Sequence, residues 1–209
     1  MLDVALIERC ADPSLTPAIV EQFVAAAGSA DPLAITVKSG GRLVLVSRPQ
    51  SPEAALEIMR QHVGKASVRV GLTQYPAGVG ITDIAELDTA LVDPCENLKR
   101  GTALFGKISR IVTKWYGSPT SKEVIPQMFE DAVYAWRTGE FEGTKVFQVE
   151  DPGGATFVSG KPLSKRQTEE DSQEVDAKPG EEDSVQPPVA VTEVGAAEMR
   201  IDLSRIGGR

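Results

Sequence analysis

Aromatic residues make up only 5% of this 209-residue chain, which also contains two cysteines and a single histidine, His62. These few residues offer no cluster with the ligand spacing of a tetrahedral metal site, so we expect no metal and no cofactor. Neither cysteine lies in a known signature of thiol catalysis, which disfavours a Cys–His nucleophile pair.

Long apolar runs are also missing. A transmembrane helix needs roughly 18 or more consecutive apolar residues, and no window reaches that length, so we expect no membrane span. The first residues, MLDVALIERCADP, contain no basic region, no long apolar stretch and no small-residue cleavage site. This start predicts no export signal. It leaves open a cytoplasmic protein, a signal that is absent from this chain, and export by another route.

Acidic residues outnumber basic ones by 30 to 22, which gives a formal net charge of -8. This balance disfavours direct nucleic-acid binding, which depends on Lys and Arg neutralising phosphates. Eight acidic residues and only one basic residue, Lys178, lie between Gln167 and Pro188. Such a segment cannot bury enough apolar surface to fold. We therefore predict a folded domain at residues 1–151 and an acidic, proline-containing disordered tail at 152–209, acting as a linker or as a docking segment.

The rest of the chain alternates helix and strand signals. Thr16 followed by Pro17 predicts a helix start, and Gly28 predicts its end. Apolar runs at 33–37 and 42–46 flank a glycine turn and predict a β-hairpin. Further elements are expected as a helix from Ser51-Pro52, a short strand or extended segment at 68–72, a long helix from Asp93-Pro94 to Gly117 and a helix at 127–137. The predicted fold class is α+β, mostly helical, with Trp115 inside the core and Trp136 either in the core or on a binding surface.

The two cysteines, Cys10 and Cys95, permit one disulfide or none. A bridge would close a loop of about 85 residues and would contribute roughly 4–5 kcal/mol in the chain-entropy model. Two unrelated buried thiols are the alternative, favoured if the protein stays in the cytosol.

Four segments in order resemble motifs of the lysozyme-like lytic transglycosylases that accompany type IV secretion and conjugation machines. The segments are Ala27-Gly-Ser-Ala-Asp-Pro-Leu-Ala-Ile35, Val70-Gly-Leu-Thr-Gln74, Val92-Asp-Pro-Cys-Glu-Asn-Leu98 and Tyr134-Ala-Trp-Arg-Thr-Gly139. The similarity covers about residues 7–143. The whole chain resembles, more narrowly, the TraH family of conjugal transfer proteins found on rhizobial and agrobacterial plasmids.

The resemblance implies a lysozyme-like fold, a Cys10–Cys95 disulfide, a periplasmic location and a role in plasmid conjugal transfer. It also implies a cleft for glycan strands of peptidoglycan or for a partner in the transfer apparatus. The residues of this chain at the cleft positions are Gln74, Tyr75, Tyr134, Trp136 and Arg137.

One departure from the family pattern affects catalysis directly. Lytic transglycosylases use one carboxylic acid as general acid and then as general base, and the pattern puts that glutamate at Ala27, which has no proton to give. Asp31 is the nearest alternative acid, but a loop or capping role before Pro32 is the favoured interpretation. Asp83 and Glu86 are expected to cap or to face solvent.

Three functional hypotheses follow. The favoured one is a catalytically silent lytic-transglycosylase-like domain that serves a conjugation apparatus. The second is an active glycan-cleaving enzyme that uses a non-standard acid such as Asp31. The third is a cytoplasmic regulatory or accessory factor without contact to the cell wall.

Overall fold

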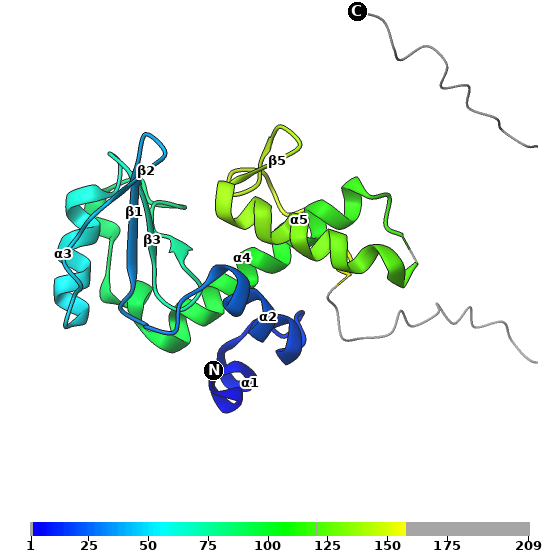
Figure 1. The fold of residues 1–209 in the computed structure, drawn as a ribbon, viewed down its shortest axis with the longest axis horizontal. Helices are drawn as coiled ribbons and strands as arrows, with labels where there is room; N and C mark the ends of the chain where they lie inside the picture. The colour runs from blue at the N-terminus through cyan, green and yellow to red at the C-terminus, as the bar shows by residue number, and fades with distance from the viewer. Residues whose placement is uncertain (1, 120, 158–209) are drawn as a thin grey trace, which may run out of the picture. The chain divides into compact units, whose positions relative to one another are not determined.

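The computed structural model describes residues 2–119 and 121–157 of the chain. The predicted tail lies almost entirely outside these described residues. The architecture mixes helices with small antiparallel sheets (Figure 1). The α-helices are α1 (Val4–Cys10), α2 (Pro17–Ala27), α3 (Pro52–His62), α4 (Pro94–Trp115) and α5 (Ile125–Thr138). Short 3-10 turns are η1 (Ile84–Glu86), η2 (Thr89–Val92) and η3 (Lys122–Val124).

The predicted helix starts are confirmed. Thr16 accepts a hydrogen bond from the Ile19 N–H at 3.4 Å, and Pro17 occupies the first turn of α2. Ser51 caps α3 in the same way, accepting from Ala54 N–H. These side chains satisfy N–H groups that the first helical turn leaves without partners.

The main sheet is larger than the predicted hairpin. It contains β1 (Ile35–Ser39), β2 (Arg42–Val44), β3 (Ser67–Val70) and β4 (Tyr75–Pro76) in the order β2-β1-β3-β4, all antiparallel. The hairpin prediction captured β1 and β2, whose turn contains Gly40 and Gly41 at positive φ. A second, two-stranded sheet pairs β5 (Glu140–Phe141) with β6 (Thr144–Lys145).

Buried apolar side chains form two separate clusters. The helical core unites α1, α2, α4 and α5 around stacked Phe23 and Phe105, with Trp136 edge-on to Phe23. The sheet core lies between the sheet, α3 and η2, and includes Val37, Met59, Val70 and Leu91. Tyr75 is half-buried and contacts both. The described chain therefore has a helical lobe and a sheet lobe, and α4 contacts elements of both.

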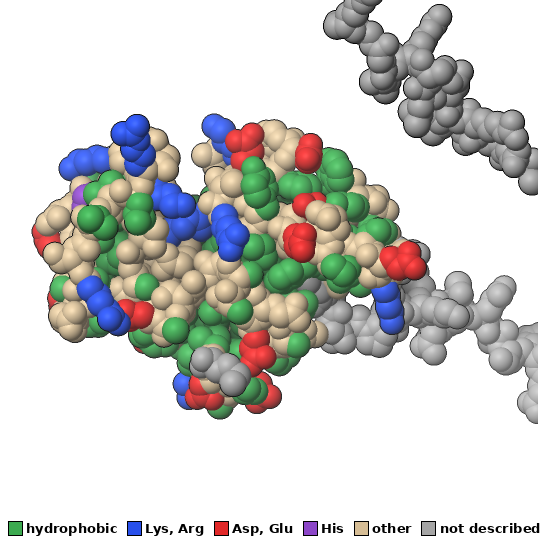
Figure 2. All heavy atoms as spheres, in the orientation of Figure 1, with side chains coloured by type: hydrophobic (Ala, Val, Ile, Leu, Met, Phe, Trp, Pro, Cys, Tyr) green, Lys and Arg blue, Asp and Glu red, His purple; other side chains and the backbone are tan. Residues whose placement is uncertain are grey.

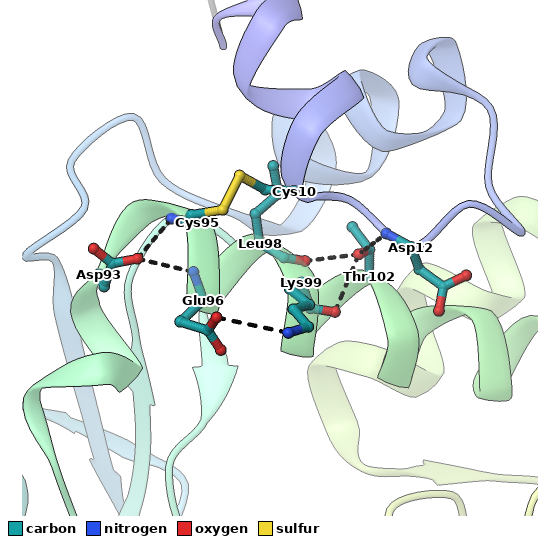
Figure 3. Close-up of a disulfide and its surroundings, with 8 residues drawn as sticks. All are labelled: Cys10, Asp12, Asp93, Cys95, Glu96, Leu98, Lys99 and Thr102. Atoms are coloured by element: carbon teal, nitrogen blue, oxygen red, sulfur yellow. Dashed lines mark hydrogen bonds and ion pairs between the residues drawn. A yellow bond between two sulfur atoms is a disulfide. The ribbon is translucent and has the colours of Figure 1, made fainter.

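A disulfide joins Cys10, the last residue of α1, to Cys95 in the first turn of α4, with the two Cα atoms 5.1 Å apart (Figure 3). Asp93 caps the same turn by accepting from the N–H groups of Cys95 and Glu96. Thr102, about two helical turns further on, accepts from the Asp12 N–H at 2.8 Å. The end of α1 is thus attached to α4 by a covalent bond and a hydrogen bond.

Two expectations need correction or extension. Trp115 was predicted in the core, but it is 56% exposed, because it is the last residue of α4 and only one side of its ring packs, against Tyr116 and the buried Phe141. Beyond the predicted boundary at 151, Thr156 is buried and the Phe157 N–H donates to Thr113 Oγ1 on α4. Within the described residues, none of the helices combines the length and apolar character needed to cross a membrane.

Candidate functional site

The four segments that carry the family resemblance meet in space around the turn at residues 71–74. At the end of α2, the Ser29 N–H donates to Leu72 O at 2.8 Å. A side chain at Gly28 would lie 2.2 Å from the same oxygen, so this close approach requires glycine. The end of α2 is therefore held directly against the turn.

Asn97 of α4 holds the turn from the other side. Its side-chain amide donates to Val70 O and Leu91 O, at 3.0 and 2.7 Å. The side-chain oxygen of Asn97, Oδ1, accepts from the Thr73 N–H and from the Thr73 hydroxyl, each at 2.9 Å. Gly71 has φ +71, and a Cβ there would lie 2.3 Å from Asn97 Nδ2. Asn97 thus fills the space that a side chain at residue 71 would need.

Trp136 completes the arrangement, and its placement corrects one expectation. It was expected either in the core or on the surface of a cleft, and the structure excludes the cleft position: Trp136 has no exposed surface, because α5 points its ring into the helical core. Its indole N–H donates to Thr73 O at 3.2 Å. Trp136 is a core residue that fixes α5 to the turn, and it has no free face for a sugar.

Gln74 is also engaged within the protein. Its backbone is in the left-handed region, with φ +52, and its side chain is 8% exposed. The amide nitrogen donates to Gly71 O at 3.1 Å, and the amide oxygen accepts from the Thr36 hydroxyl at 2.7 Å. Next to it, burial raises the pKa of Tyr75, an effect that the charge of Arg100 partly opposes. Gln74 therefore stabilises the turn against β1, and Tyr75 packs between the helical core and the sheet core.

Ala27 is the last residue of α2, half-buried against the helical core. Its neighbours Ala26 and Gly28 each line a surface hollow. The Arg137 guanidinium donates to Ala26 O, so a cation from α5 lies at the carbonyl end of α2, where the helix dipole favours positive charge. The position implied for the catalytic glutamate thus carries a methyl group beside a guanidinium.

Arg137 borders two hollows. The α2–α5 hollow, of about 260 Å³, is lined by Ala26, Phe129, Glu130, Val133, Tyr134 and Arg137. Tyr134 is 62% exposed there. The β3–α5 hollow, of about 370 Å³, lies between β3 and the α5–β5–β6 region, and its lining includes Arg69, Arg137, Glu140, Lys145 and Phe147. Figure 2 shows Lys and Arg side chains beside the notch between the two lobes.

Arg69, on β3, was not predicted from the sequence. Its guanidinium donates to three backbone carbonyls, those of Gln74, Trp136 and Arg137. It also lies 5.8 Å from the ring centre of Trp136 and 5.7 Å from that of Phe147. Burial lowers the pKa of Arg69 to about 10. Arg69 thus connects the sheet lobe to the end of α5.

The alternative acids are placed in structural roles. Asp31 accepts from the Leu33 N–H at 3.0 Å and pairs with Arg48 at 2.8 Å, so both of its carboxylate oxygens are engaged in the loop. Asp83 caps η1 by accepting from Ala85 N–H. Glu86 accepts from the Thr82 hydroxyl and N–H, and these hydrogen bonds lower its pKa.

Comparison with known proteins identifies the family. The model of the TraH_2 family matches residues 1–208, and the chain belongs to this family. Membership indicates a protein related to conjugal transfer. The chain is 58% identical over 209 residues, the full length of both chains, to "Uncharacterized protein y4dP" of Sinorhizobium fredii. No solved structure matches the chain, and the lysozyme-like fold stays a prediction.

Proposed function

We propose that the protein is an accessory component of conjugal transfer whose lysozyme-like domain binds glycan strands of peptidoglycan without cutting them. The observation that carries this proposal is the convergence of the four family-like segments on one turn, with a methyl group at the implied acid position. A domain that keeps the supporting contacts but lacks the proton donor is suited to holding a glycan, because glycosidic cleavage needs a positioned acid.

The disulfide supports a location outside the cytosol. Disulfides persist in oxidising compartments such as the bacterial periplasm, where peptidoglycan is accessible. Trapping free thiols in intact donor cells tests this point. We expect Cys10 and Cys95 to resist alkylation until a reductant is added, whereas ready alkylation would support a cytoplasmic accessory factor.

Glycan binding is tested by sedimentation of the full chain with purified peptidoglycan sacculi. Tyr134 offers an exposed aromatic face in the α2–α5 hollow, and stacking on such a face contributes about 0.5–1.5 kcal/mol. We expect Tyr134→Ala to weaken retention by roughly three- to tenfold. Trp115→Ala, which removes another exposed aromatic residue, is the matched control and should leave retention unchanged.

Zymography separates binding from cleavage. The full chain should produce no clearing in a peptidoglycan gel, and gain of clearing by Ala27→Glu would support the implied position of the lost acid. Clearing by the unmodified chain that disappears in Asp31→Asn would instead establish an active transglycosylase. If a transfer protein retained the chain while sacculi did not, the ligand would be a protein.

A further inference from the structure

Strand β2 is an outer strand of the main sheet, and its free edge is apolar. It pairs with β1 on one side only, because the order of the sheet is β2-β1-β3-β4. Residues 43–46 read Leu-Val-Leu-Val and contain no charge. Natural edge strands are commonly protected by Lys, Pro or a bulge, because their unpaired N–H and C=O groups attract other strands. This edge has such protection only at its two ends, at Arg42 and Pro49.

Side chains along the edge alternate between the sheet core and solvent. Val44 and Val46 are half-buried and pack against the sheet core. Leu43 and Leu45 lie on the other face and are 62% and 92% exposed. The alternation continues past Val44, the last residue of β2, so residues 45 and 46 keep the strand pattern. Two leucines therefore stand side by side on the solvent face of an edge strand.

The backbone groups of the same two leucines have no partner within the sheet. The β1–β2 turn consists of two glycines at positive φ, and the first pair beside it is Ser39–Arg42. In a two-residue hairpin this first pair exchanges hydrogen bonds, and bonded and non-bonded pairs then alternate. Val44 therefore bonds to β1, whereas the N–H and C=O groups of Leu43 and Leu45 point away from it. Among the described residues, no backbone hydrogen bond outside the sheet pairing involves either leucine.

A second copy of the chain fits this edge about a two-fold axis at Val44. Antiparallel pairing then places Leu43 of each copy opposite Leu45 of the other, and each pair exchanges hydrogen bonds through the groups that β1 leaves free. Val44 faces its own counterpart, and four leucines gather on one face of the joined sheet. The edge is therefore complementary to itself in both its backbone groups and its side chains.

The charges near the edge are compatible with this register. The two copies of Arg42 lie four residues apart along the joined strands, about 14 Å at about 3.4 Å per residue. This separation exceeds the Debye length of about 8 Å at physiological salt, so solvent ions screen their repulsion. A register centred on Leu43 would halve the distance. Arg48 is already paired with Asp31 at 2.8 Å, and Lys38 lies on β1, one strand away from the junction.

We infer that β2 is the interface of a homodimer, in which the edge strands of two copies pair antiparallel and join their main sheets into one. The interface is small, because an edge of five residues buries less than the roughly 1,200–2,000 Å² of stable complexes. The dimer is therefore weak and reversible, and its population rises with the concentration of the chain. This inference does not depend on glycan binding.

Sedimentation velocity of the full chain tests the dimer. From about 1 µM to about 1 mM, the mean sedimentation coefficient should rise as monomer converts to dimer. Leu45→Lys places a cation on the free edge and should weaken association at least about tenfold. Because Leu45 is 92% exposed, this variant should fold normally. Ile84→Lys, at an exposed aliphatic residue of η1, is the matched control and should associate as the unmodified chain does.

Two double variants test the register. Leu43→Lys with Leu45→Glu places opposite charges across the junction, whereas Leu43→Lys with Leu45→Lys places like charges there. We expect the first to associate at least about tenfold more tightly than the second. Hydrogen exchange gives a second readout. At high concentration the N–H groups of Leu43 and Leu45 should become protected, while the exchange of Val44, which is already bonded to β1, should not change.

Three results would overturn the homodimer: a sedimentation coefficient that stays constant over the whole range, association that Leu45→Lys leaves unaffected, and equal association of the two double variants. The second result would show that another surface joins the copies, and the third that the strands do not pair in this register. None of these results affects retention by sacculi, so the proposed glycan-binding function is tested separately.

Discussion

Asn97 binds three backbone groups near the site, as many as Arg69 does. One buried amide satisfies two carbonyls and one N–H, in the segment at residues 70–73 and in η2. In the sequence, Asn97 was recognised only as part of the segment Val92–Leu98, which opens a helix. Its role could not be predicted, because the carbonyls that it reaches are 27 and 6 residues away in the chain.

We predict that Asn97→Ala will lower the free energy of unfolding by about 3 kcal/mol or more, since each buried polar group left without a partner costs about 1–3 kcal/mol. Urea denaturation followed by circular dichroism measures this change. Thr82→Ala, at an exposed position, provides a control that should change stability far less. An Asn97→Ala variant as stable as the control would show that the turn is held by other contacts.

The residues that were predicted to line the cleft fall into an exposed group and a buried group. Tyr134 and Arg137 lie on the exposed side of α5 and border one hollow, as a binding site would require. Gln74 and Trp136 are buried. Helical spacing alone does not distinguish these cases, because residues 134, 136 and 137 are close in sequence and only the packing of α5 shows which of them is covered.

At the scale of elements, local signals predicted the helices better than the sheet. Caps at Thr16, Ser51 and Asp93 depend on neighbouring residues and appeared as expected. The sheet depends on pairing of β1 with β3, which joins Ile35 to Val70, and on the two-residue strand β4. Such long-range pairing has no local signature, so the β1–β2 hairpin and a strand or extended segment at 68–72 were predicted, but not their pairing into one sheet.

The segment after β6 is attached to α4 through one ion pair. Asp151 accepts from Arg110 Nε at 2.7 Å, and this hydrogen bond lowers the pKa of Asp151. Because the folded-state pKa lies below the usual value of about 3.8, the ionised carboxylate stabilises the folded protein above that pH. This contribution is lost as the pH falls through the lowered pKa.

Asp151→Asn should therefore lower the free energy of unfolding at pH 7 by less than about 1 kcal/mol, since the Asp151 side chain is 40% exposed and solvent screens the pair. The difference from the unmodified protein should shrink below about pH 4. Denaturation curves across pH 3–7 test this, with Glu150→Gln as the neighbouring control. A difference that stays constant down to the lowest pH would contradict the assignment.

At the scale of the whole domain, the Cys10–Cys95 bridge is the main constraint on the unfolded chain. It closes a loop of 85 residues and is formed by the only two cysteines of the chain. The sequence alone was compatible with one disulfide or with two separate thiols, and the family resemblance implied the bridge. The structure supports it by bringing α1 against α4.

Replacing both Cys10 and Cys95 by alanine should reduce the free energy of unfolding by about 3–5 kcal/mol, because the unfolded chain regains the entropy of the open loop. Thermal or urea denaturation measures the loss. Addition of dithiothreitol should destabilise the unmodified chain by a similar amount and leave the double variant unaffected. Equal stability with and without reductant would show that the bridge does not form in solution.

The same bond gives the molecule a closed covalent ring that contains α2, all four strands of the main sheet and α3. A protease that nicks the exposed β1–β2 turn, near Lys38 or Arg42, would open this ring without releasing either piece. The two fragments would separate on a reducing gel and migrate together on a non-reducing one. The N-terminal helix therefore stays tethered to the rest of the domain even after the backbone between them has been cut.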